Sequence, residues 1–216
     1  MKSFLPLAAL LLAITSATAQ SDHPKAFVGV GGGISIPQGD FAGTHHTKFG
    51  QGFAKNGSHV DISVGYRFAN HFGGMLLLRG QNNVVDIEQM AKSAIPTSPG
   101  TIITVESENW RQTSIMAGIF GILPIGVEKK FALEARGMTG YAKAVLPERT
   151  TTVTRPADAY WIKNKESESL AFSYLAGLSF RYNLSPRFAL SLSGDYMASQ
   201  HTFKDVTYVN TYGETI

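Results

Sequence analysis

The chain has 216 residues, enough for one domain with a sizeable interior. It contains no cysteine, which excludes disulfides, cysteine-based metal sites and thiol nucleophiles. Its formal charge of +3 is small and its basic residues form no cluster, so nothing indicates nucleic acid as a partner.

The first residues have the three parts of a bacterial export signal. Lys2 is positive, residues 4–14 form an apolar run, and Ala-Thr-Ala at 17–19 supplies the small-x-small pattern that signal peptidase cleaves. We therefore expect residues 1–19 to be a cleaved signal peptide and residues 20–216 to be the mature domain. The alternative, an uncleaved membrane anchor, needs about 20 apolar residues, and this run is shorter.

Short runs of alternating polarity fill the mature part. In residues 60–68 every even-numbered residue is apolar, and the odd-numbered residues are Asp61, Ser63, Gly65 and Arg67. Side chains alternate between the faces of a strand, so this pattern predicts a strand with one wholly apolar face. Seven such strands are predicted, at 26–36, 60–68, 72–81, 110–122, 131–141, 170–182 and 188–196. The alternation fails in Met75–Leu78, where the faces stay unassigned.

The connections between these strands alternate in length. Short, turn-forming segments lie at 69–71, 123–130 and 183–187, whereas long ones lie at 38–57, 84–109 and 147–167. Bacterial outer-membrane barrels show this rhythm, with tight periplasmic turns and long extracellular loops. The predicted strand lengths also suit the ~9–11 residues that a tilted strand needs to cross a membrane.

Aromatic residues gather beside the short turns. They are Tyr66, Phe68, Phe72, Phe131, Phe180, Tyr182 and Phe188. In a barrel these side chains form a ring at the periplasmic lipid interface, where amphipathic rings settle. The alternative, core packing in a soluble β-protein, gives no reason for aromatics to collect at one end of the strands.

Lipid offers no hydrogen-bond partners, so a β-structure that spans it must close on itself with its apolar faces outward. The charged residues then fall inside: Asp61, Arg67, Arg79, Glu134, Arg136, Arg181 and Asp195. About eight strands leave room only for side chains, so we expect opposite charges to pair within a filled lumen. The alternative is a small porin or ligand-transport barrel in which these charges line an open path.

The residues at 28–41 (VGVGGGISIPQGDF), together with VGYRF at 64–68 and LSFRY at 178–182, resemble the strands of small bacterial outer-membrane β-barrel proteins of the OmpA/OmpX-like group, often labelled the porin family. The resemblance implies an all-β fold, an antiparallel up-and-down transmembrane β-barrel of eight strands, in the outer membrane of a Gram-negative bacterium. It implies roles in envelope integrity, adhesion or surface recognition. The matching motifs are architectural, so they assign no functional role to any residue of this chain.

One feature departs from that family, whose chains usually end on a final strand with a terminal aromatic. Here Gly213-Glu214-Thr215-Ile216 follows the seventh strand closely. We therefore expect the last strand to be missing or cut short in this sequence. The alternative is that residues 206–212 form a short eighth strand.

Three sets of residues contain groups that occur in binding or catalytic sites. His45 and His46 are adjacent on an extended segment and point apart, so a metal site is not expected. The glycines at 29–33 lie within a strand that no helix follows, which argues against a phosphate loop and favours close strand packing. Ser199, His201 and Asp205 would be needed for an outer-membrane lipid-modifying enzyme, but three groups this close on one strand are not expected to converge.

The sequence thus predicts a monomeric outer-membrane barrel that is not an enzyme, with no catalytic, cofactor-binding or metal-binding residues. Its partners are the lipid bilayer and, through the long loops, an extracellular or envelope partner. A small porin or ligand-transport barrel is the alternative, and a lipid-modifying enzyme is a weaker one.

Overall fold

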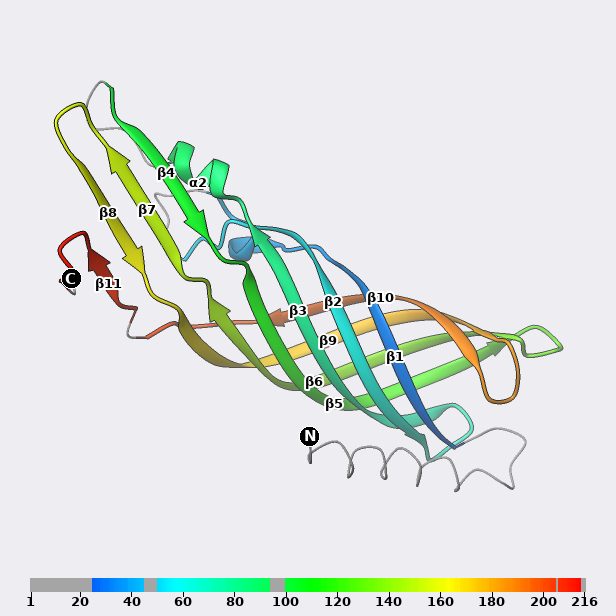
Figure 1. Cartoon of the computed structure of the whole chain (residues 1–216). Helices are drawn as coiled ribbons and strands as arrows, with labels where there is room; N and C mark the ends of the chain where they lie inside the picture. Colours follow the sequence, from blue (N-terminus) through cyan, green and yellow to red (C-terminus); the bar gives the residue numbers. More distant parts are fainter. Residues whose placement is uncertain (1–24, 45–49, 94–99, 205, 215–216) are drawn as a thin grey trace, which may run out of the picture.

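The computed structural model describes residues 25–44, 50–93, 100–204 and 206–214, and it contains two antiparallel sheets. The larger sheet has seven strands in the order β1-β2-β3-β5-β6-β9-β10, and its strands curl around a common interior (Figure 1). The bounds of these strands are β1 Ala26–Ser35, β2 Ala54–Arg67, β3 Phe72–Val85, β5 Trp110–Ile125, β6 Phe131–Leu146, β9 Ser167–Asn183 and β10 Ala189–Ser199.

All seven strands predicted from alternation are present, and most are longer than predicted at their outer ends. The expected signal peptide and the pair His45–His46 lie outside the described residues. Within the described part of the chain, no helix is long and apolar enough to cross a membrane.

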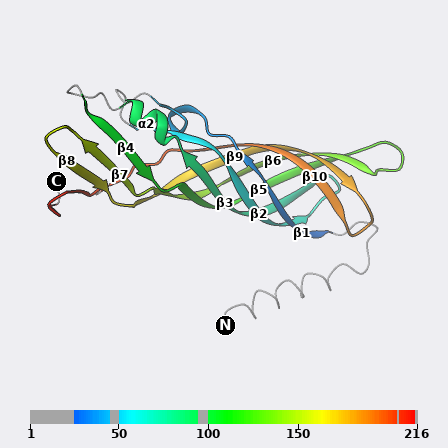
Figure 2. The same cartoon turned by 45° about the horizontal axis from the view of Figure 1, so that its top comes forward.

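A second sheet was not predicted. It has the order β11-β8-β7-β4, and it projects beyond one end of the larger sheet in both views (Figures 1 and 2). Its strands are β4 Ile102–Ser107, β7 Arg149–Thr154, β8 Ala159–Asn164 and β11 Tyr208–Asn210. The described parts of the long connections at 84–109 and 147–167 are therefore largely in helices and strands. The short helices η1 (Gly39–Phe41) and α2 (Ile87–Ser93) lie at the same end.

The suggestion that residues 206–212 form an eighth barrel strand is wrong. Only Tyr208–Asn210 are in a strand, and they pair with β8 of the second sheet, opposite Asn164, Lys163 and Ile162. Within the described residues, β1 and β10 each have a barrel neighbour on one side only.

The barrel strands follow the expected alternation between faces. The large apolar residues on one phase are exposed, such as Val30 (84%) and Leu192 (80%), which is the outward, lipid-facing arrangement. The structure also assigns the faces of the ambiguous run in β3, where Met75 and Leu77 are buried and Leu76 and Leu78 are exposed.

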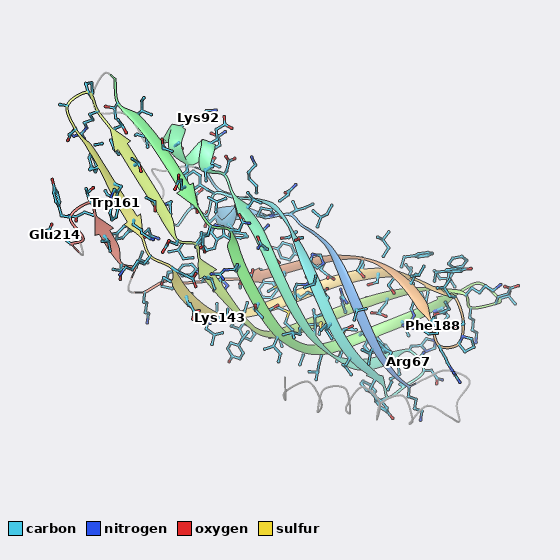
Figure 3. All side chains as sticks on the ribbon, viewed as in Figure 1. Arg67, Lys92, Lys143, Trp161, Phe188 and Glu214 are labelled. Atoms are coloured by element: carbon cyan, nitrogen blue, oxygen red, sulfur yellow. The ribbon has the colours of Figure 1, made fainter. Side chains whose placement is uncertain are left out.

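The short turns lie at the end opposite the second sheet, where Figure 3 places Arg67 and Phe188. The turn between β9 and β10 is closed by the backbone N–H groups of Arg187 and Phe188, which both donate to the Ser185 hydroxyl. The aromatic residues predicted to ring this end are all exposed. Phe131 stacks on Phe180 and Tyr182, with ring centroids 5.5 and 5.0 Å apart.

Candidate functional site: the barrel interior and the outer sheet

Four charged side chains form an alternating chain of ion pairs inside the barrel. Arg79 donates through two nitrogens to the carboxylate of Asp61, both at 2.7 Å, and through Nη2 to Asp195 Oδ2 at 2.6 Å. Arg136 donates to the same Asp195 carboxylate at 2.7–3.0 Å. The side chains are only 6–15% exposed, so each charge needs the others. The sequence-predicted pairing of these residues is confirmed.

A second charged group lies nearer the short turns. Arg181 Nη1 is 4.0 Å from Glu134 Oε2, and Glu134 is 7% exposed. Arg67 lies on the same face of β2 as Asp61, as the alternation predicts. Ser179 and Ser193 hydroxyls meet at 2.9 Å beside this group. The interior at this level is therefore polar and hydrogen-bonded.

An apolar cluster also lies inside the barrel, and sequence analysis missed it. Six side chains, each at most 5% exposed, make up this cluster: Met75, Leu77, Met116, Phe120, Met138 and Leu175. Phe27 packs edge-on against Phe120 at 5.4 Å, and the Arg181 guanidinium lies over the Phe27 ring at 5.8 Å. Unbranched methionine fills irregular gaps in a packed interior. The strand patterns had suggested a uniformly polar interior. The structure shows that part of the interior is apolar.

The glycines of β1 make room for the inward side chains of β2. A Cβ atom at Gly33 would lie 2.8 Å from the ring of His59, and one at Gly29 would lie 2.6 Å from the Ser63 hydroxyl. Such separations are too short for carbon, so a larger residue at either position would force the His59 ring or the Ser63 hydroxyl to turn away. The expected role of these glycines in close strand packing is confirmed.

The outer sheet has two different faces. Cross-strand pairing puts Thr104, Thr152 and Trp161 in one row, and Glu106, Thr150 and Lys163 in the next row of the same face. On the opposite face, Val105 and Val153 are buried, as is Asn164. Trp161 and Glu214 stand far from the short turns in Figure 3. The outer sheet thus presents a hydroxyl-rich face that carries one large aromatic side chain.

Side-chain contacts order the loops at the barrel mouth. Trp110 donates from Nε1 to the Gly52 carbonyl at 2.8 Å, and its ring packs against Phe41 and Phe203. Arg149 at the start of β7 contacts Met90 Sδ of α2 at 3.1 Å, and burial lowers the pKa of Arg149. The Trp110 contacts therefore join the segment before β2 and the segment after β10 to β5, and the Arg149 contact joins β7 of the outer sheet to α2.

Ser199 and His201 lie closer together than the sequence suggested. Ser199 Oγ is 3.0 Å from His201 Nε2, because residues two apart on an extended segment share a face. Gln112 donates to Ser199 Oγ at 3.5 Å, and the His201 ring stacks on Phe203. Burial lowers the pKa of His201. Asp205 lies outside the described residues, so the convergence of all three groups stays untested.

A serine–histidine contact is part of a hydrolytic site only if an oxyanion donor and room for a substrate accompany it. Here the histidine is packed on an aromatic ring, and its Nδ1 is buried without a hydrogen-bond partner among the described residues. Within those same residues, no three His, Asp or Glu side chains gather in a metal-binding group.

Comparison with known proteins gives one family and one solved structure. The family model described as "Outer membrane protein beta-barrel domain" matches residues 6–213. Among solved structures, the chain is similar to Ail, the attachment invasion locus protein of Yersinia pestis, with 15% identity and a TM-score of 0.38, over 72% of this chain and 78% of that one. No curated protein matches the chain in sequence.

Proposed function

Because the chain belongs to the outer membrane protein beta-barrel domain family, it is an outer-membrane barrel, and we propose that its role is surface interaction through its outer sheet. In this proposal residues 1–19 are a cleaved export signal, the protein is a monomer, and the barrel anchors the sheet. An extracellular or envelope partner binds the sheet.

The observation that carries the proposal is the ordered outer sheet itself. Loops that only connect strands need few residues and no structure, whereas these connections form four paired strands, one of which, β7, also contacts α2 through Arg149 and Met90. Function concentrates in loops that a rigid scaffold positions. A sheet face with Thr104, Thr152 and Trp161 side by side offers hydrogen-bonding groups around an aromatic anchor, which suits recognition.

The interior supports a role other than transport. Ion pairs join β2, β3, β6 and β10 across the lumen, and the six-residue apolar cluster lies in the same interior. An eight-stranded barrel has an interior that side chains can fill. In this proposal the lumen is filled, and the small-porin alternative is not favoured. The protein in planar bilayers should therefore show little or no conductance, and large, steady channels would reject a filled lumen.

The interaction role is tested by removing the β7–β8 hairpin from the cell surface. Residues 150–163 are replaced by a short Gly-Ser turn, and the matched control replaces residues 126–128 in a periplasmic turn. Bacteria that express each variant are scored for attachment to cultured cells, to matrix-coated surfaces and to one another. We expect only the hairpin deletion to lower attachment. Heat-modifiable gel mobility checks that both barrels fold, and equal attachment by all three strains would reject the proposal.

A further inference from the structure

A shallow groove of about 840 Å³ lies on the outer surface of the barrel near the short turns. Its floor is one row of cross-strand neighbours, Gly121 on β5 and Ala135 on β6. Phe72 pairs with Gly121 at one end of this row, and Leu178 pairs with Ala135 at the other. Two small residues thus stand between two large ones in the floor of the groove.

A second row borders the groove on the side of the turns. Leu123, Leu133 and Phe180 are cross-strand neighbours in this row. All three are on the outward phase and are 44–61% exposed. The groove is therefore apolar and opens toward lipid, and its volume lies within the roughly 300–1,000 Å³ of typical ligand sites.

The adjoining turns give the groove a basic border. The turns at 68–71, 126–130 and 184–188 hold the basic residues Lys129, Lys130 and Arg187 and one acidic residue, Glu128, which pairs with Lys130 at 2.6 Å. His71 also lines the groove at this end. Basic side chains beside a membrane-embedded pocket favour anionic lipid head groups.

We propose that this groove is a binding site for one phospholipid of the periplasmic leaflet, with an acyl chain over Gly121 and Ala135 and an anionic head group at the basic turns. A chain seated between Phe72 and Leu178 has apolar walls on both sides as well as beneath it. A lipid chain that lies over an outward side chain such as Ile115 or Ile119 contacts protein on one side only. The site is independent of the outer sheet, so it stands or falls separately from the surface-interaction role.

The test fills the groove with larger side chains while the surface of the barrel stays apolar. Gly121→Leu with Ala135→Leu removes the hollow, and Gly137→Leu with Ala117→Leu is the matched control, since these residues also face outward on β6 and β5 but do not line the groove. The full mature chain is incubated with phosphatidylglycerol in mild detergent, and native mass spectrometry counts retained lipids. Unfolding in urea checks that both variants stay folded.

We expect one retained phosphatidylglycerol on the wild type and the control, and about tenfold lower occupancy on the groove-filled variant, because each lost methylene contact costs several-fold in affinity. Diacylglycerol with the same chains should be retained less, since it lacks the phosphate. Equal retention by all variants, no retention by the wild type, or equal binding of diacylglycerol would each overturn the proposal.

Discussion

Arg79 on β3 and Asp195 on β10 meet inside the barrel with Nη2 and Oδ2 2.6 Å apart, although 116 residues separate them in sequence. Arg79 also holds Asp61 on β2, so one guanidinium joins two strands that are far apart in the sheet order. The curl of the sheet brings these strands together, and the ion pairs fix the curl.

Arg79→Met should therefore destabilise the barrel strongly. The change leaves Asp61 and Asp195 buried with less compensation, and breaking a buried pair in this way costs about 3–5 kcal/mol. The control is Lys143→Met, which breaks the pair between Lys143 and Glu168 at 2.7 Å. Both of those side chains are half exposed, so we expect less than about 1 kcal/mol. Urea unfolding in lipid vesicles measures the free energy of unfolding of both variants. Equal losses of stability would show that the interior ion pairs are as well solvated as the exposed Lys143–Glu168 pair.

The lipid-facing surface gives a second prediction. Leu192 on β10 is 80% exposed on the outward face, so Leu192→Arg places a charge in lipid and should cost ~2–4 kcal/mol near the midplane. The control is Val127→Arg in a periplasmic turn, where the side chain is fully exposed and water can solvate the charge. If folding into vesicles tolerates both changes equally, the inward and outward faces are reversed.

The barrel strands could be predicted because lipid enforces one physical rule, apolar outside and small or polar inside, along their whole length. Residues 60–68 and 170–182 obey it almost without exception. The interior escaped prediction for the same reason. An apolar residue that faces inward, such as Leu77 or Phe120, interrupts the alternation of apolar and polar residues. Such an interruption does not indicate from sequence alone that the residue is buried in the interior.

The outer sheet escaped prediction for a different reason. Its strands are only three to six residues long and lie outside the membrane, so neither length nor alternation marks them. A weaker signal was present in the runs Ile-Ile-Thr-Val at 102–105 and Thr-Thr-Thr-Val-Thr at 150–154, because β-branched residues favour strands. The contact between Ser199 and His201 could also be foreseen, since their spacing of two puts them on one face.

His201 should make the barrel mouth sensitive to pH. Burial lowers its pKa below the ordinary 6.5, so the unfolded chain takes up a proton more readily than the folded one. The stability of this region is therefore complete above about pH 6.5 and declines as the pH falls from there toward the lowered pKa of the folded state. Trp110 reports on it, because Phe203 contacts both Trp110 and His201. In a Trp161→Phe background, Trp110 fluorescence should change between pH 7 and 5, and His201→Gln should flatten that change. A change that survives His201→Gln would assign it to another group.

The seam between β1 and β10 gives the last prediction. Both strands run from the short turns toward the outer sheet, so they cannot pair antiparallel with each other, and one strand antiparallel to both fits between them. We expect that appending, through a flexible loop after residue 216, an alternating strand of about ten residues stabilises the barrel, because unpaired backbone groups in lipid cost several kcal/mol each. Its inward side chains should be large, since Gly29, Gly31 and Gly33 lie on the inward face of β1. The control appends the same residues in an order without alternation. The denaturation midpoint in vesicles should rise only for the alternating strand, and an equal effect of both would show that the seam does not accept a strand.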